Sequence, residues 1–161
     1  MELLCESAGP EDTTALGAGL ARLLRPGDIV FLRGELGVGK TTLVRAAARA
    51  LGVTDPVTSP SFSVANRYVG RVPVAHLDAY RLASPDEEEM GLAREMVGDD
   101  AVAFVEWPDA LVHGLPPARI EVDLHHGGGD RRLVTLRVSD PNLESPLRRI
   151  VDDLRARHRD T

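Results

Sequence analysis

The stretch Gly34-Glu35-Leu36-Gly37-Val38-Gly39-Lys40-Thr41 fits G-x-x-x-x-G-K-[ST], the pattern of a phosphate-binding P-loop. Lys40 is the only lysine among the chain's 19 basic residues, and all the others are arginine. A lysine ammonium is a compact point charge that fits between phosphate oxygens, whereas a guanidinium is planar and broad. The alternative is a glycine-rich turn that only caps a helix. The lone lysine at this place favours the phosphate site.

The segments around this loop predict the strand and the helix that the motif requires. Ile29–Leu32 is a continuous apolar run, which is typical of a strand buried on both faces. An alanine-rich helix is predicted over about Gly39–Leu51, directly after the loop. Further upstream, residues 2–6 are predicted to form a short strand, followed by a helix with Asp12 as its N-cap.

The rest of the chain predicts more strands and two more helices. The predicted elements are strands Phe62–Tyr68 and Val72–Leu77, a helix opened by the capping box Ser84-Pro85-Asp86-Glu87, strand Ala101–Val105, strands over Ile120–Leu124 and Val134–Val138, and a helix opened by Ser145-Pro146. The last two strands alternate apolar and polar residues, which predicts an antiparallel hairpin.

These elements together predict an α/β fold of the P-loop NTPase class. The expected central sheet is mixed and mostly parallel, with flanking helices, and the antiparallel C-terminal hairpin is added at its edge. Residues 1–161 are expected to form a single P-loop ATPase domain, in which about 140–161 make a C-terminal helical extension.

Composition limits the partners and the compartment. The net charge of −6 argues against a broad nucleic-acid surface on this chain. Cys5 is the only cysteine, so no internal disulfide can form, which fits a reducing cytosol. No apolar run approaches the length of a membrane span, and the start of the chain lacks the basic and apolar regions of a secretory signal. We therefore expect a cytoplasmic protein that has no membrane association.

The P-loop pattern predicts how a nucleotide is held. Backbone N–H groups from Gly37 to Thr42 are expected to point at the phosphates, at the positive end of the following helix. Lys40 is expected to reach the β- and γ-phosphates, and the hydroxyl of Thr41 to bind Mg²⁺. The guanine-binding motif of many GTPases needs a second lysine, which this chain lacks, so ATP or ADP is the expected nucleotide.

Two acids are candidates for the rest of the metal site, which usually lies at the end of a strand beside the P-loop strand. Val102-Ala103-Phe104-Val105-Glu106 has the uninterrupted apolar run, so Glu106 is predicted to bind the metal, directly or through water. Val74-Ala75-His76-Leu77-Asp78 is similar, and Asp78 is predicted to orient the attacking water or a metal-bound water. The alternative for each acid is a strand-end residue that meets solvent. Which of the two is closer to the metal stays open.

Four motifs together resemble those of the TsaE family, also called YjeE. They are Gly34–Thr42, Thr58-Ser59-Pro60-Ser61-Phe62, His76-Leu77-Asp78-Ala79-Tyr80-Arg81-Leu82 and Val105-Glu106-Trp107, in this order and at similar spacing. The resemblance covers about residues 8–138. It implies an ATPase required for N6-threonylcarbamoyladenosine (t6A) in tRNA, which acts on the TsaD–TsaB complex and meets tRNA only through that complex. It also leaves room for hydrolysis that is slow without these partners.

The resemblance assigns roles to single residues. Lys40, Asp78 and Glu106 are implied in catalysis, and Thr41 and Glu106 in magnesium binding. Trp107 resembles a tryptophan beside the nucleotide, and Arg132 a basic residue near the adenine; core packing and an exposed hairpin arginine are the respective alternatives. The residues expected to bind nucleotide are Glu35, Leu36, Gly37, Val38, Gly39, Lys40, Thr41, Thr42, Trp107 and Arg132.

Two loops carry weaker expectations from the same resemblance. Ser59-Pro60-Ser61-Phe62 resembles a switch-like loop that responds to the γ-phosphate, with Ser61 where the family usually has threonine. Pro10–Thr13 is expected to touch the adenine from the other side. His125-His126 lacks the spacing of a strong metal site, and His76 is interpreted as structural.

Two other functions compete with the ATPase. A small-molecule kinase also needs a P-loop and an acid, but it usually adds an arginine-bearing lid, and no clear lid insertion is present. A nucleotide-dependent binding module would have negligible hydrolysis. The intact set of Lys40, Thr41, Asp78 and Glu106 argues against complete inactivity.

Overall fold

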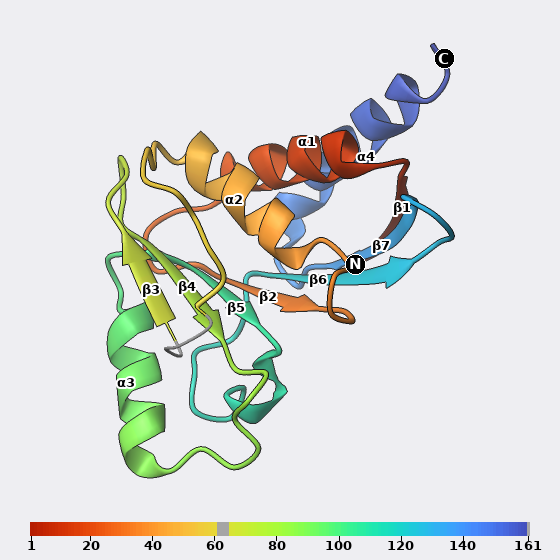
Figure 1. Ribbon diagram of the computed structural model, residues 1–161. Coiled ribbons are helices and arrows are strands. Elements are labelled where there is room, and N and C mark those ends of the chain that lie inside the picture. The colour runs from red at the N-terminus through yellow and green to blue at the C-terminus, as the bar shows by residue number, and fades with distance from the viewer. Residues whose placement is uncertain (61–64, 161) are drawn as a thin grey trace.

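The computed structural model describes residues 1–60 and 65–160. Within this range the strands are β1 (Glu2–Ser7), β2 (Ile29–Arg33), β3 (Ala65–Tyr68), β4 (Val74–Asp78), β5 (Val102–Glu106), β6 (Ile120–His126) and β7 (Arg132–Arg137). The α-helices are α1 (Pro10–Ala21), α2 (Lys40–Ala50), α3 (Glu87–Val97) and α4 (Glu144–Arg157), as Figure 1 shows. The start of the predicted strand Phe62–Tyr68 lies outside the described residues.

The strands form one mixed sheet with the order β1-β7-β6-β2-β5-β4-β3. Its middle strands β6, β2, β5 and β4 are parallel, so the predicted mixed α/β sheet with parallel strands around the P-loop strand is confirmed. β6 and β7 form the predicted antiparallel hairpin, and β1 adds to it. The expectation that antiparallel strands lie at one edge was incomplete. β3 pairs antiparallel with β4 at the other edge. β6, the first strand of the hairpin, pairs parallel with β2 and so belongs to the parallel part of the sheet as well.

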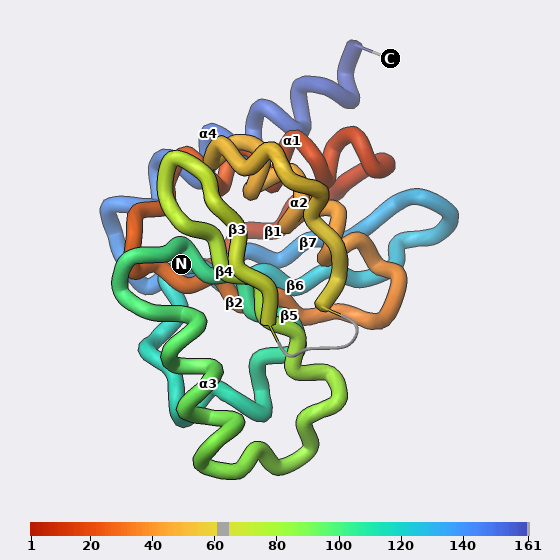
Figure 2. The backbone as a smooth tube through the Cα atoms, turned by 60° about the vertical axis from the view of Figure 1, so that its left-hand side comes forward, coloured from red at the N-terminus to blue at the C-terminus, as the bar shows by residue number. Residues whose placement is uncertain are grey.

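Helices cover both faces of this sheet. α1, α2 and α4 lie on one face and α3 lies on the other, as the two views show (Figures 1 and 2). β2 is buried on both faces: Val30 and Leu32 point to the core under α1, α2 and α4, and Ile29 and Phe31 point to the core under α3. The continuous apolar run of this strand is explained by the alternation of side chains between two cores.

The packing of α1 against α2 depends on Gly17. A Cβ atom at this position would lie 2.4 Å from the carbonyl oxygen of Leu43 in α2. On its other side α1 meets α4, where a Cβ at Gly19 would lie 3.2 Å from Ile150. α1 therefore packs against both α2 and α4 on this face of the sheet.

Two predicted helix starts were wrong. The N-cap of α1 is Gly9 and its first residue is Pro10, whereas Asp12 lies inside the first turn, where its carboxylate accepts from the N–H of Ala8 at 2.8 Å. The capping box of α3 does not begin at Ser84. Asp86 is the N-cap and pairs with Glu89, because this aspartate accepts the N–H of Glu89 at 2.7 Å.

The C-terminal helix α4 begins at Glu144, just before the predicted Ser145-Pro146. Leu147, Val151 and Leu154 form its apolar face and are buried in the core shared with α1 and α2. The division into one domain with a helical extension stays a prediction. Among the described residues, none of the helices combines the length and the apolar character that a membrane-spanning segment needs.

Replacement of Gly17 by alanine is expected to destabilise the fold. The added methyl group meets backbone atoms of α2 that can yield only if the helices separate, so we expect a loss of about 2 kcal/mol in the free energy of unfolding, measured with urea. Gly91→Ala is the matched control, because Gly91 lies in α3 with open space around it. That change should be neutral or stabilise by up to about 1 kcal/mol. Equal stability of Gly17→Ala and the parent chain would contradict the close helix contact.

Candidate nucleotide site

The loop between β2 and α2 has a backbone that requires glycine. Gly34 has φ +147°, and a Cβ there would lie 2.5 Å from the carbonyl oxygen of Leu124 in β6 and 2.8 Å from Val38. Gly37 and Gly39 have φ +74° and +114°, in the region that other residues rarely adopt. Val38 is buried and anchors the loop from within. The strand–loop–helix order predicted for the motif is therefore confirmed.

The start of α2 presents N–H groups that can bind an anion. Among the described residues, no hydrogen bond engages the backbone N–H groups of Gly37, Gly39, Lys40, Thr41 and Thr42. The N-terminus of a helix carries a partial positive charge in addition to these donors. This arrangement fits the phosphate groups of a nucleotide.

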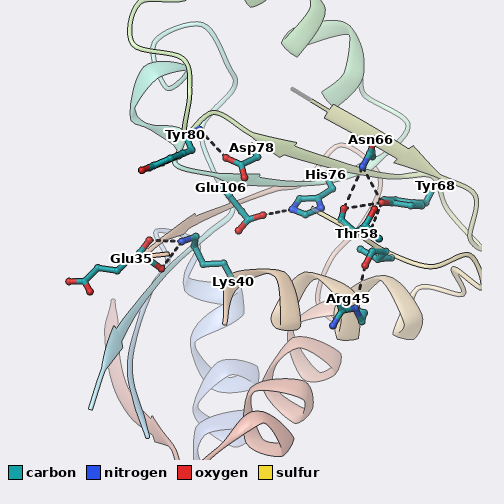
Figure 3. Close-up of polar contacts among 12 residues, drawn as sticks. Glu35, Lys40, Arg45, Thr58, Asn66, Tyr68, His76, Asp78, Tyr80 and Glu106 are labelled. Carbon is teal, nitrogen blue, oxygen red and sulfur yellow. Dashed lines mark hydrogen bonds and ion pairs between the residues drawn. The ribbon is translucent and has the colours of Figure 1, made fainter. Parts of the chain in front are cut away.

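Lys40 is held by the loop that precedes it. Its ammonium donates to the carbonyl oxygen of Gly34 at 2.5 Å and to that of Glu35 at 3.0 Å, and it lies 4.5 Å from the ring centroid of Trp107. Burial lowers the pKa of Lys40, while the nearby carboxylates of Glu106 and Asp78 act in the opposite direction. The lysine is thus a buried cation close to two acids (Figure 3).

The two predicted acids end neighbouring parallel strands. Asp78 of β4 is the register partner of Glu106 of β5, and Glu106 is in turn the partner of Leu32 of β2. Both carboxylates therefore lie on the side of the sheet that faces α2. Burial and the charge of Glu106 raise the pKa of Asp78, against the lowering effects of the Tyr80 N–H, His76 and Lys40. Asp78 accepts from the Tyr80 N–H at 2.9 Å.

His76 contacts Glu106, which the sequence interpretation missed. Its Nε2 lies 2.5 Å from Oε2 of Glu106, and the histidine is fully buried (Figure 3). Its Nδ1 has no hydrogen-bond partner among the described residues. An Nε2–H that donates to the carboxylate fits this geometry, because a carboxylate is an acceptor. The spacing of His76 and Asp78 contained the signal, since residues i and i+2 of a strand share a face.

Trp107 follows Glu106 in an unusual backbone conformation. It has φ 54°, and no other residue except glycine has a positive φ in the described part of the chain. This conformation costs about 1 kcal/mol or more. The backbone N–H of Trp107 donates to the carbonyl of Leu32 at 3.1 Å, and the centroid of its indole ring lies 4.9 Å from that of the Tyr80 ring. The turn therefore directs the indole toward Lys40 and fixes it against Tyr80.

Two cavities flank the start of α2. The larger, of about 220 Å³, is lined by Leu36, Gly37, Gly39, Lys40, Thr41, Thr42, Ser59, Asp78, Glu106 and Trp107. The smaller, of about 150 Å³, is lined by Gly9, Pro10, Thr13, Gly37, Val38, Gly39, Thr42, Asp130 and Arg132. Gly37, Gly39 and Thr42 border both, so a ligand that crosses the start of the helix can pass from one into the other.

The structure places the remaining predicted residues as follows. Arg132 is partly buried, and its Nε donates to the carbonyl of Val38 at 2.8 Å, which fixes the guanidinium against the P-loop. Glu35 lines neither cavity; its carbonyl holds Lys40 and its side chain is 80% exposed. Ser59 borders the larger cavity, while Ser61 and Phe62 of the predicted switch-like loop lie outside the described residues.

The start of that loop is anchored to the fold. The carbonyl of Val57 accepts from Arg45 of α2 at 3.3 Å, and the carbonyl of Thr58 accepts from Asn66 at 3.4 Å (Figure 3). Tyr68 also contacts Thr58 through its hydroxyl group. These contacts fix the chain as it approaches the larger cavity at Ser59.

The larger cavity offers the ligand types that Mg²⁺ prefers. Among the described residues, no group of three or more His, Cys, Asp or Glu side chains is placed to hold a metal by itself. A magnesium ion on a nucleotide does not need such a group, because phosphate oxygens and water supply most of its ligands. Thr41 and Glu106 both line the cavity and provide one hydroxyl and one carboxylate. These residues fit the ion.

Comparisons with known proteins agree on one family. Residues 7–134 match the family model of the threonylcarbamoyl adenosine biosynthesis protein TsaE. The chain is 35% identical over 135 residues to the tRNA threonylcarbamoyladenosine biosynthesis protein TsaE of Bacillus subtilis, covering 83% of this chain and 84% of that protein. It is 42% identical over 118 residues to the TsaE of Streptomyces coelicolor, covering 71% and 80%.

A solved structure extends the likeness to the whole chain. The crystal structure of YdiB from Bacillus subtilis has a TM-score of 0.75 and 30% sequence identity, and the match covers 98% of this chain and 96% of that one. The P-loop, the two strand-end acids and the sheet that joins them are thus found in a chain that belongs to the TsaE family, whose members are named for the biosynthesis of threonylcarbamoyladenosine in tRNA.

Proposed function

We propose that this protein is a magnesium-dependent ATPase that supports t6A formation in tRNA by acting on the TsaD–TsaB complex in the cytoplasm. One observation carries the proposal: the register of β2, β5 and β4 brings Lys40, Thr41, Asp78 and Glu106 to a single cavity at the start of α2. A P-loop alone would support nucleotide binding. The two acids beside it add what hydrolysis needs, which is a metal ligand and a group that handles water.

Each residue has a chemical task in this proposal. The N–H groups at the start of α2 and the Lys40 ammonium hold the phosphates, for which the ammonium leaves the carbonyls of Gly34 and Glu35. Thr41 and Glu106 would hold Mg²⁺, which would supply positive charge against the phosphates. Asp78 orients the attacking water; the raised pKa of its carboxyl favours acceptance of a proton.

The smaller cavity is the proposed site of the nucleoside. It adjoins the larger cavity at Thr42, where the α-phosphate would cross the start of α2. Arg132, Pro10 and Thr13 are among the residues that line it. ATP is favoured over GTP because Lys40 is the only lysine, so no second lysine is present to complete the guanine-binding motif.

Phosphate release tests the proposal directly. The protein should release phosphate from ATP faster when TsaD–TsaB is present, because a partner that covers the cavity can exclude bulk solvent, leave the attacking water in place and complete the site. Lys40→Ala should reduce the stimulated rate by about 100-fold or more, since it removes the charge that faces the phosphates. Transfer of the phosphoryl group to a metabolite would contradict the proposal. So would ATP binding without any release, alone or with the partners.

Asp78→Asn is expected to separate activity from stability. Its loss as a proton acceptor should lower the stimulated rate by about 100-fold. The pKa of Asp78 in the folded state lies above the ordinary value of 3.8 that it has in the unfolded chain, so its carboxylate costs stability as the pH rises through that ordinary value, and the cost is complete above the folded-state pKa. Below the ordinary value both states are protonated, and the cost is absent. The asparagine variant should therefore be more stable than the parent chain at pH 7. The gain should vanish near pH 3.

Thermal and urea unfolding at both pH values measure this difference. Asp153→Asn on the exposed side of α4 is the control, and it should change neither rate nor the pH dependence. If Asp78→Asn retains the parent rate, the carboxylate does not handle the attacking water.

His76 is expected to support Mg²⁺ binding because it holds the Glu106 carboxylate in place. Because its Nε2 holds one carboxylate oxygen, His76→Ala should free the Glu106 side chain and raise the Mg²⁺ concentration for half-maximal hydrolysis by about 10-fold. His76→Gln keeps a donor and should show a smaller shift. ADP binding without Mg²⁺ should stay unchanged in both variants, which also reports intact folding. An unaltered Mg²⁺ dependence in His76→Ala would show that the contact does not support the metal site.

A further inference from the structure

The C-terminal end of α4 forms a clamp on one buried carboxylate. Nε2 of His158 lies 2.5 Å from Oδ2 of Asp12, and Nε of Arg157 lies 3.4 Å from Oδ1 of the same residue. The side chain of Asp12 is only 10% exposed. Figure 1 shows this end of α4 beside the start of α1. The contact joins positions 146 residues apart in the sequence.

Asp12 in turn fixes the turn between β1 and α1. Its Oδ2 also accepts the N–H of Ala8 at 2.8 Å, so one carboxylate holds both the turn and the clamp. Within the turn, the hydroxyl of Ser7 donates to the Gly9 carbonyl at 2.8 Å and lies 2.9 Å from the hydroxyl of Thr13. Burial alone would raise the pKa of Asp12, but His158, the Ala8 N–H and Arg157 outweigh it and lower the pKa. The carboxylate is therefore held as a charged group.

The fixed turn is a wall of the smaller cavity. Gly9, Pro10 and Thr13 line that cavity together with the P-loop and Arg132. Thr13 also packs toward the loop, since a Cβ at Gly39 would lie 3.8 Å from its methyl group. Asp12 directly precedes Thr13 in the sequence, so a displacement of Asp12 would also move a residue that lines the cavity.

We propose that Arg157 and His158 are positioning residues for nucleotide binding: they hold Asp12, and through it the Gly9–Thr13 wall of the cavity that takes the nucleoside. The inference rests on the proposed function, because it requires that a nucleotide occupies this cavity. The two residues lie beyond the segment 7–134 that matches the family model. Neither lines the cavity, so they act on the ligand only through the turn.

A purely structural role for the clamp would make a different prediction. α4 is attached independently by Leu147, Val151 and Leu154 in the core, and by Arg155, which donates to the carbonyl of Leu4 at 3.1 Å. Loss of the clamp should therefore leave the helix in place. The turn, in contrast, is joined to the end of α4 through Asp12, which contacts both Arg157 and His158.

Calorimetric titration with ADP tests the proposal on the full chain. The double variant Arg157→Ala/His158→Ala should raise the Kd for ADP roughly fivefold, with a small change in melting temperature. Hydrogen–deuterium exchange without ligand should accelerate in residues 8–13 and stay unchanged in β2 and β5. The single variant His158→Gln retains Arg157 and keeps a hydrogen-bond donor at position 158. It should recover part of the ADP affinity that the double variant loses. Arg148→Ala/Arg149→Ala is the matched control, because these exposed arginines lie on the same helix.

The outcomes separate this inference from the proposed function. An unchanged Kd in the double variant, with normal ADP binding by the parent chain, would overturn the positioning role and leave the ATPase proposal intact. Faster exchange throughout the sheet together with a weaker Kd would also overturn it, because the clamp would then be a general support of the fold. If the parent chain does not bind ADP, both proposals fail.

Discussion

The parallel pairing of β2 with β5, and of β5 with β4, is the constraint on which the site depends. Leu32, Glu106 and Asp78 are register partners across these strands. The three segments therefore leave the sheet at the same end, where the parallel strands have their carboxyl ends. After Leu32 the chain turns through the P-loop into α2, and Lys40 returns toward the two acids. A slip of one residue in either pairing would move an acid to the α3 face, away from α2. The site is therefore a consequence of register more than of any single side chain.

The opposite charges at this end of the sheet attract one another, but their burial costs hydration free energy. Glu106 is 3% exposed and Lys40 is 5% exposed, and a buried charge needs partners to offset its lost hydration. His76 contacts the Glu106 carboxylate, and the positive charge of Lys40 lies near it. The carbonyls of Gly34 and Glu35 accept hydrogen bonds from the Lys40 ammonium. Burial raises the pKa of Asp78 and lowers the pKa of Lys40, so the charged forms of both groups are disfavoured in the folded protein. Groups that are kept charged at the expense of stability are typical of sites selected for chemistry.

Local patterns in the sequence predicted much of this arrangement. The P-loop and the strands that end in Asp78 and Glu106 both follow from residue types at short spacing. The sequence did not reveal that β6 lies beside β2, because strand order depends on long-range packing. The N-caps were misplaced at Asp12 and Ser84, since several capping residues stand close together there. The clamp of His158 on Asp12 had no local pattern at all.

Trp107 offers the most direct test that a nucleotide binds at this edge of the sheet. It is the only tryptophan in the chain, and its ring lies 4.5 Å from the ammonium of Lys40. A titration with ADP and Mg²⁺ should give a saturable change in tryptophan fluorescence, because phosphates that draw Lys40 away alter the surroundings of the indole. The same titration of Lys40→Ala should give no change in the same concentration range. An equal saturable change in that variant, or none in the parent chain, would contradict the placement of the nucleotide.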